Sequence, residues 1–294
     1  MKIKKYAVRM ALVLAAMAVA LFSAEAQFGR RGGFGRRFSS PDQIPYEHRA
    51  EQEMMEKAIN PEFREDTFTF ARLIFTDYEG TRQFGGGRLW DDDSPDADLN
   101  AIYRLHLVTS LKVRPGLSFI NITAKELNDH PFVYLAAAGR VILTDDQVTD
   151  LRNYLLNGGF LMADDFWGDL QWEHFREQMQ RVLPDHQPVE ITLDHRIFHT
   201  VFDFKKEPQI PSVGAYFSTL QSWDPNWDYG EKGHDPRYYA IYDDKQRMIA
   251  LICHNNHYGD GWEHEGDDPR YFDKFSEPMG YPMLINILVY TMSH

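Results

Sequence analysis

The stretch LRNYLLNGGFLMADDFWGD, residues Leu151–Asp169, decides the fold of this chain. It reads as the end of an amphipathic helix, a two-glycine stop, a short buried strand and then two adjacent carboxylates. Ligands of an open α/β sheet bind just beyond the carboxyl ends of its strands. Asp164 and Asp165 therefore stand where an active-site residue would stand, and the stretch predicts both a parallel sheet and a candidate site at its edge.

Residues 1–26 have the pattern of a secretory signal peptide. Basic residues precede an apolar run over Ala11–Phe22, which is too short to span a bilayer comfortably. Cleavage after Ala26 would fit the small-x-small rule, so we expect a periplasmic or secreted mature chain that begins near Gln27. An uncleaved membrane anchor is the alternative. No later apolar run is long enough to span, so the sequence predicts no membrane span in the mature chain.

The charge of the chain argues against nucleic acid as a partner. The formal net charge is −13, and contacts with phosphate require Lys and Arg. A basic tract, FGRRGGFGRRF at Phe28–Phe38, is too rich in glycine to fold. It predicts a solvated linker, or a contact with an anionic surface polymer or an acidic partner.

Three segments follow from the composition. The signal peptide (1–26) precedes a Gly/Arg-rich segment with a helical arm (27–62), and one α/β domain spans 63–294. A weak helical period over Pro41–Asn60 indicates that the arm packs on this domain.

Strands alternate with well-capped helices along the domain. A capping box at Thr144–Gln147 opens one helix, and Asp169 is expected to cap the next. The pattern predicts a mostly parallel sheet with helices on both faces and a late hairpin at one edge. The expected strands are Phe68–Thr76, Leu117–Ile122, Phe132–Ala137, Phe160–Ala163, Val189–Leu193, Tyr238–Tyr242 and Met248–Cys253.

Several segments match a known family in order. They are FTFARLIF, a GGG…W followed by Asp98-Leu99-Asn100, LRNYLLNGGFLMADD, DHRIF at Asp194–Phe198, Gly261-Trp262 and the terminal NILVYTM. In these pieces the chain resembles the bacterial DUF4159 family, a domain of unknown function. That family is similar to a branch of the class I glutamine amidotransferase-like fold, a flavodoxin-like three-layer α/β sandwich. The resemblance implies the fold and supplies no reaction, and we expect no cofactor.

One departure from the amidotransferase pattern bears on activity. Those enzymes carry a nucleophilic Cys at a strand-to-helix elbow, whereas the elbow LMADDFWG of this chain holds Asp164 and Asp165. Cys253, the single cysteine, ends a late strand without flanking glycines. A thiolate nucleophile needs an electropositive, partly exposed setting, so we expect Cys253 to be buried instead.

Catalysis, if present, would depend on Asp164, Asp165 and His195. Consecutive side chains of a strand alternate in direction, so one aspartate should face the crevice and the other should cap the next helix or bond a loop. His195 follows Asp194 and could act as an oriented general base, although a role in a turn is the alternative.

A second candidate region is a long polar loop predicted over His254–Ser276. Aromatic rings beside amides and carboxylates are typical of glycan-binding loops. His254, His257 and His264 could supply three zinc ligands, but their spacing matches no helical zinc motif, so no metal is predicted. Asp91–Asp93 is interpreted as a solvated turn. The predicted ligand-binding residues are Asp164, Asp165, Trp167, His195, His254, Asn255, His257, Tyr258 and Trp262.

The sequence therefore favours an exported cell-envelope protein with a non-catalytic domain that binds a polar glycan or peptide, or another envelope protein. The alternative is a hydrolase that uses Asp164 or Asp165 with His195, with or without a metal, on a glycan or peptide. A third reading is a structural subunit recognised through its arginine-rich arm.

Overall fold

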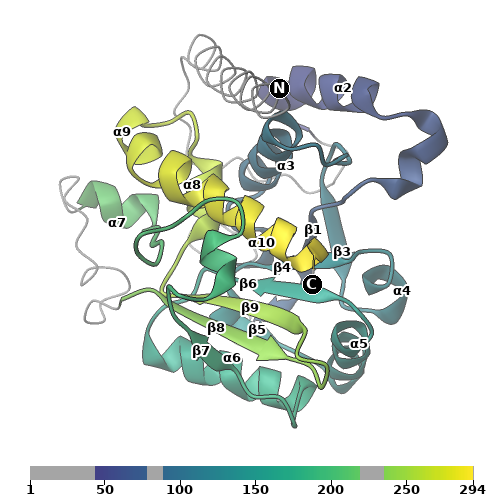
Figure 1. Ribbon diagram of the computed structural model, residues 1–294, viewed down its shortest axis with the longest axis vertical. Coiled ribbons are helices and arrows are strands. Elements are labelled where there is room, and N and C mark those ends of the chain that lie inside the picture. Colours follow the sequence, from purple (N-terminus) through teal and green to yellow (C-terminus); the bar gives the residue numbers. More distant parts are fainter. Residues whose placement is uncertain (1–43, 78–88, 219–234, 294) are drawn as a thin grey trace, which may run out of the picture.

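The computed structural model describes residues 44–77, 89–218 and 235–293. A seven-stranded sheet runs through it, with helices on both faces (Figure 1). In spatial order the strands are β3 (Ser118–Asn121), β1 (Ala71–Ile74), β4 (Phe132–Leu135), β6 (Phe160–Ala163), β9 (Met248–His254), β8 (Arg237–Tyr242) and β7 (Val189–Ile191). The predicted mostly parallel sheet with a hairpin toward one edge is confirmed.

The order of the strands places the candidate site. The five strands from β3 to β9 are parallel, and β8 runs antiparallel to both of its neighbours. Counted along the chain, the parallel strands lie in the order 2-1-3-4-5, which is the flavodoxin-like order. The carboxyl ends of β4, β6 and β9 are therefore adjacent. A short antiparallel pair, β2 (Thr76–Asp77) and β5 (Val141–Ile142), lies beside this sheet.

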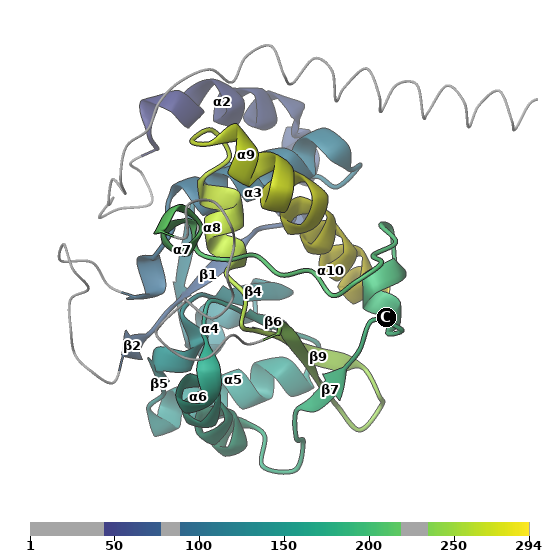
Figure 2. The ribbon, with the colours of Figure 1, turned by 90° about the vertical axis from the view of Figure 1, so that its left-hand side faces the viewer.

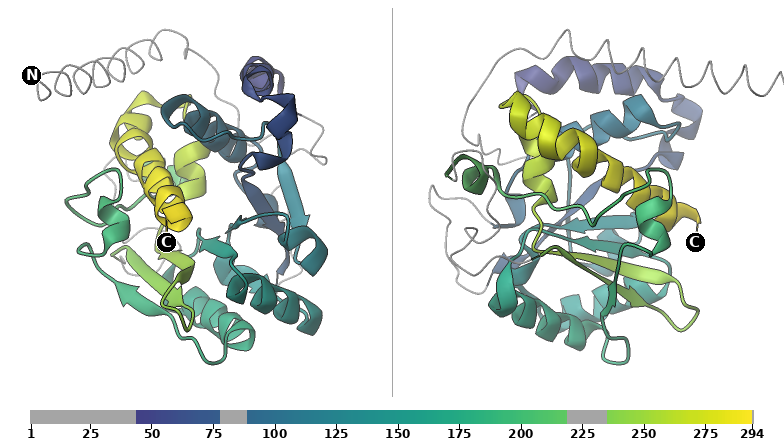
Figure 3. Two further views of the ribbon diagram at one scale, coloured as in Figure 1. Left: turned by 45° about the vertical axis from the view of Figure 1, so that its right-hand side comes forward. Right: turned by 60° about the vertical axis from the view of Figure 1, so that its left-hand side comes forward.

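Helices cover the sheet in two layers, which Figures 2 and 3 show from other sides. Phe160 and Met162 of β6 pack in one core with α3 and α10, and Leu161 and Ala163 pack in the other with α5 and α6. The helices are α2 (Arg49–Ala58), α3 (Asp96–Val108), α4 (Ala124–Leu127), α5 (Asp145–Leu156), α6 (Gly168–Val182), α7 (Val213–Ser218), α8 (Tyr258–Glu263), α9 (Pro269–Tyr271) and α10 (Tyr281–Ser293).

Local chemistry accounts for several boundaries. The capping box at Thr144 is present, and Gly158 takes a positive φ of 120° where α5 ends. The prediction for Asp169 is wrong, because α6 begins at Gly168 with Trp167 as its N-cap. Gly168 has a φ of 69°, so the chain turns into the helix before it reaches Asp169.

Two other segments differ from the sequence prediction. The strand expected over Phe68–Thr76 is divided, because Thr76 pairs antiparallel with Ile142 while β1 ends at Ile74. The long polar loop expected over His254–Ser276 instead contains α8, α9 and a π-helical turn (Phe272–Gly280). Two glycines in YGDGWE lower its helix propensity, and the burial of aromatic side chains overrides that preference.

The segment before the sheet contains α2, where the sequence predicts the helical arm. Met55 of α2 is buried in the core. The signal peptide and the Gly/Arg tract lie outside the described residues. Within the described ranges, every helix is too short or too polar to cross a bilayer.

His48 links α2 to α3. Its Nδ1 lies 3.1 Å from Oε2 of Glu51 and its Nε2 lies 2.9 Å from Oδ1 of Asp96. Burial opposes the charged form of His48, but the two carboxylates outweigh burial and raise its pKa from 6.5 to about 9. The protonated imidazole therefore stabilises the packing of the arm.

A raised histidine pKa makes stability depend on pH. The contribution of His48 should be complete below pH 6.5 and should be lost as the pH rises through about 9. His257 and His264 also have raised pKa values, so the whole chain should lose stability over this window with or without His48. We expect urea unfolding to show that the wild type loses about 2 kcal/mol more than His48→Gln between about pH 6.5 and 9. An equal loss in the two proteins would contradict this assignment.

Candidate functional site

Asp164 joins the end of β6 to the start of α8. Its Oδ2 accepts hydrogen bonds from the backbone N–H groups of Tyr258 (2.7 Å) and Gly259 (3.3 Å) and from the hydroxyl of Tyr134 (3.1 Å). Burial raises the pKa of Asp164 to about 6, although His257 and these bonds favour the carboxylate. Asp164 thus caps α8, which comes from a distant part of the chain, and not the next helix, α6, as the sequence predicts.

The side chain of Asp165 faces His257 and not the first turn of α8. Its backbone is left-handed, with a φ of 56°, and its Oδ1 lies 3.4 Å from Nε2 of His257. The residue is only 6% exposed. Burial raises the pKa of Asp165 well above its usual value, and the neighbouring carboxylate of Asp93 adds to this despite the opposing effect of His257.

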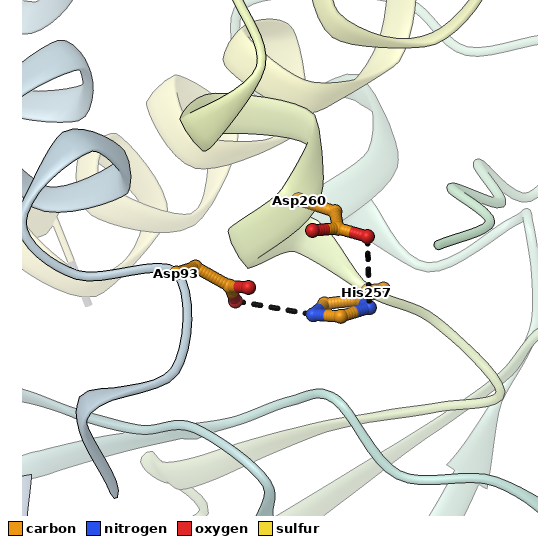
Figure 4. A group of neighbouring side chains, drawn as sticks. All are labelled: Asp93, His257 and Asp260. Atoms are coloured by element: carbon orange, nitrogen blue, oxygen red, sulfur yellow. Dashed lines mark hydrogen bonds and ion pairs between the residues drawn. The ribbon is translucent and has the colours of Figure 1, made fainter. Parts of the chain in front are cut away.

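His257 lies between carboxylates on both sides of its ring (Figure 4). Its Nε2 is 3.1 Å from Oδ2 of Asp93, and its Nδ1 is 3.4 Å from Oδ2 of Asp260. Burial lowers the pKa of His257, but Asp165, Asp260 and Asp93 outweigh it and raise the pKa well above 6.5. We use the name acidic cluster for the three aspartates that contact this imidazolium, Asp93, Asp165 and Asp260, together with Asp164, which bonds the backbone next to it.

The backbone fixes the ligand-bearing side chains. Asp93 is left-handed, with a φ of 62°, and lies against Gly259 at the start of α8. A Cβ at Gly259 would overlap Oδ2 of Asp93, so only glycine permits this approach. Oδ2 of Asp260 accepts a hydrogen bond of 2.7 Å from the N–H of Val213.

A second group continues along α8. Nε2 of His264 lies 3.4 Å from Oδ1 of Asp260 and 3.1 Å from Oε2 of Glu263, while its Nδ1 lies 2.6 Å from Oδ2 of Asp267. Burial lowers the pKa of His264, but the surrounding carboxylates outweigh burial and raise this pKa to about 12. Burial also raises the pKa of Glu263, to about 7. Asp260 thus faces two histidines, one through each oxygen.

The acidic cluster has few compensating charges. Among the described residues, no Lys or Arg forms an ion pair with any of its aspartates. The guanidinium of Arg72 pairs with Asp98 instead and bonds the carbonyls of Trp90 and Asp92. Because isolated buried charge costs several kcal/mol, the excess of carboxylates favours a bound cation.

Backbone strain is concentrated at the same edge of the sheet. Ala137 follows β4 with a φ of 44°, Asp165 follows β6 and Asn255 follows β9 with a φ of 58°. Non-glycine residues rarely adopt such values, and they are found preferentially at functional sites. This distribution supports a site at the carboxyl ends of these strands.

The model of the family described as "Domain of unknown function (DUF4159)" matches residues 69–292. The chain belongs to the DUF4159 family. This confirms the family that the sequence motifs indicate, and the matched region includes the whole acidic cluster. No curated protein matches the chain.

Two predicted ligand residues of this DUF4159 protein hold its backbone. Nε2 of His254 lies 3.1 Å from the carbonyl oxygen of Gly168, and the His254 ring stacks on Phe166. Oδ1 of Asn255 accepts a bond from the N–H of Gly168. Trp167 is also buried. These contacts fix the turn that carries Asp165.

The predicted aromatic ligand residues lie in the core beneath the cluster. The hydroxyl of Tyr258 is 2.6 Å from that of Tyr238, and the ring of Trp262 packs 5.6 Å from that of Tyr134. Tyr258 and Trp262 are both fully buried. Both rings pack in the core next to the acidic cluster, so neither is exposed to stack on a sugar ring.

The structure does not bring His195 to the aspartates. Its Nε2 lies 3.1 Å from the hydroxyl of Tyr242. Tyr242 pairs with Met248 at the start of β9, whereas His257 follows the end of that strand. Cys253 is fully buried, and burial raises the pKa of its thiol. The prediction of a buried cysteine is confirmed.

Asp93 and Asp260 are the site residues that sequence reasoning missed. The sequence predicts Asp93 to lie in a solvated turn, but it is 8% exposed and contacts His257, 164 positions away. A local signal did exist for Asp260. The spacing His257-x-x-Asp260-x-x-Glu263-His264 places these side chains along one face of a helix.

Proposed function

We propose that this protein is an exported, non-catalytic binding domain of the cell envelope that holds a positively charged group in its acidic cluster. The proposal is carried by one observation. Four buried aspartates gather at this edge of the sheet, and three of them lie within 3.4 Å of the His257 ring. The only cationic side chains beside them are the imidazoles of His257 and His264, because none of the four pairs with a Lys or Arg among the described residues. A cation would offset the repulsion between these carboxylates.

Two placements support binding over amidotransferase-type catalysis. Asp164 follows the strand at whose end the resemblance to amidotransferases would place a cysteine. One of its oxygens accepts three hydrogen bonds, which give this side chain a structural role. Cys253 is enclosed by the core. An ammonium group of a peptide or an amino sugar, or a metal ion, would supply the positive charge.

A hydrolase is the second candidate, and one contact favours it. Asp165 and Asp93 both face Nε2 of His257, which is the kind of carboxylate–histidine pairing that general acid–base catalysis uses. In that case His257 takes the role that the sequence suggested for His195. Turnover of a peptide or glycan that is lost in His257→Gln would favour this candidate.

Asp165→Asn tests whether the acidic cluster is a binding site or a structural ion-pair network. Asn tolerates the left-handed backbone, and the substitution removes a charge that burial disfavours. We expect chelator-treated protein to gain about 1–2 kcal/mol in urea unfolding, because functional sites retain destabilising groups. The exposed Asp169→Asn should change stability by less than about 0.5 kcal/mol. A large loss of stability in Asp165→Asn would identify a structural network.

Binding is tested by thermal melting with agmatine, spermidine, Zn²⁺ and Mn²⁺. At least one of these cations should raise the Tm of the wild-type protein and should have a smaller effect on Asp165→Asn. If none raises the Tm, the proposed function is wrong. N-terminal sequencing of the exported protein tests the proposed cleavage near Ala26.

A further inference from the structure

We infer that the cation is a divalent metal ion, held by Asp93, His257 and Asp260. This inference rests on the proposed function and names the chemical class of its ligand. Each of the three residues offers one ligand atom, and these atoms all lie within 4.8 Å of one another. Two carboxylate oxygens and one imidazole nitrogen form a donor set suited to Zn²⁺, and Mn²⁺ also accepts it.

Burial favours a single ion over an organic cation. Asp93, His257 and Asp260 are 8%, 5% and 5% exposed. An ammonium or guanidinium group would need room for the chain to which it is attached. A metal ion needs only the space among its ligands, and its charge is strong enough to offset the desolvation of several carboxylates.

Two buried atoms at the His257 ring lack hydrogen bonds. Nδ1 of His257 has no hydrogen-bond partner, and its contact with Asp260 is long, at 3.4 Å. Oδ1 of Asp165 is also without a hydrogen bond, and it faces Nε2 of the same imidazole at 3.4 Å. A metal on one ring nitrogen and a carboxylate on the other is the usual arrangement of a metal-bound histidine.

The three ligands are fixed before any ion binds. Asp93 is held by its left-handed backbone against Gly259, and Asp260 is held by the N–H of Val213. Asp164 fixes the first turn of α8, which carries His257 as its N-cap. Preorganised ligands lower the cost of binding.

The neighbouring group Asp260, Glu263 and His264 also places three ligand atoms within 4.8 Å. We assign the ion to the first group because all of its ligands are buried and it includes an unpartnered nitrogen. In the second group both nitrogens of His264 already lie close to carboxylates, at 3.1 Å from Glu263 and 2.6 Å from Asp267. The two assignments predict different effects of the two histidine substitutions.

The test uses the whole mature chain, treated with EDTA and then freed of chelator. Titration calorimetry with Zn²⁺ and with Mn²⁺ should show that at least one of these ions binds the wild-type protein. His257→Gln and Asp93→Asn should weaken this binding at least about tenfold. His264→Gln should retain it. His48→Gln is the matched control, because His48 is also buried between two carboxylates.

The outcomes separate this inference from the proposed function. If neither metal binds the wild-type protein while agmatine or spermidine raises its Tm, the metal assignment is wrong and the binding function stands. If no cation has an effect, both are wrong. Binding that survives His257→Gln, or that is lost in His264→Gln, would overturn the assignment to the first group. Circular dichroism shows that each variant is folded, and the wild-type titration decides the question if a variant is not.

Discussion

Arg72→Leu is expected to lower the free energy of unfolding by about 3–5 kcal/mol, the largest effect of any substitution considered. Arg72 is fully buried in β1, and its Nε and Nη2 bond the carboxylate of Asp98 at 3.0 and 2.8 Å. Its Nη1 donates to the carbonyls of Trp90 and Asp92, which lead into Asp93. Loss of the guanidinium leaves a buried carboxylate and two carbonyls unpaired, and the loop beside the acidic cluster loses its anchor.

A double variant gives the control for this prediction. Arg72→Leu combined with Asp98→Leu removes both charges, and replacing a buried ion pair with apolar groups costs far less than breaking it. Urea unfolding should therefore show the double variant to be more stable than Arg72→Leu alone. If the single variant lost less than about 1 kcal/mol, the pair would not be a structural anchor.

Gly259→Ala should cost about 3 kcal/mol and should also impair the site. The new Cβ would overlap Oδ2 of Asp93 and would lie 2.8 Å from its Cγ, so Asp93 or α8 must move. We expect thermal melting to show a lower Tm and a smaller stabilisation by the bound cation. Both effects arise from one contact, because Asp93 is packed against the turn that carries His257.

Gly214→Ala is the matched control, since Gly214 lies in α7 and a Cβ there meets nothing within 4 Å. Alanine also has the higher helix propensity, so this variant should be as stable as the wild type or more so. Equal stability of Gly259→Ala and Gly214→Ala would show that the approach of Asp93 to α8 does not restrict the fold.

Much of the fold can be predicted from local sequence patterns. The span Phe160–Ala163 is recognisable because it is apolar on both faces, and α5 is recognisable because a capping box opens it and Gly158 ends it. These signals involve residues a few positions apart. The helix α8 cannot be predicted in this way, because Gly259 and Gly261 have low helix propensity. The helix is stabilised instead by the packing of Trp262 in the core.

Only some of the site residues can be predicted from the sequence. Asp164 and Asp165 are predictable because they end a buried strand, and the rule for open α/β sheets points to that position. Asp93 is not, because its contact with His257 spans 164 positions and depends on how α8 packs against the β1–α3 connection. For His195 the local signal is misleading. This histidine follows Asp194 in the sequence, but in the structure it bonds Tyr242, far from the acidic cluster.

The most direct measurement is anomalous diffraction from crystals of the mature protein soaked in Mn²⁺ or Zn²⁺. The account predicts an anomalous peak among Asp93, His257 and Asp260, at about 2.0–2.2 Å from the ligand atoms. An acidic cluster without a peak at saturating metal, with the carboxylate–imidazole contacts unchanged, would contradict it.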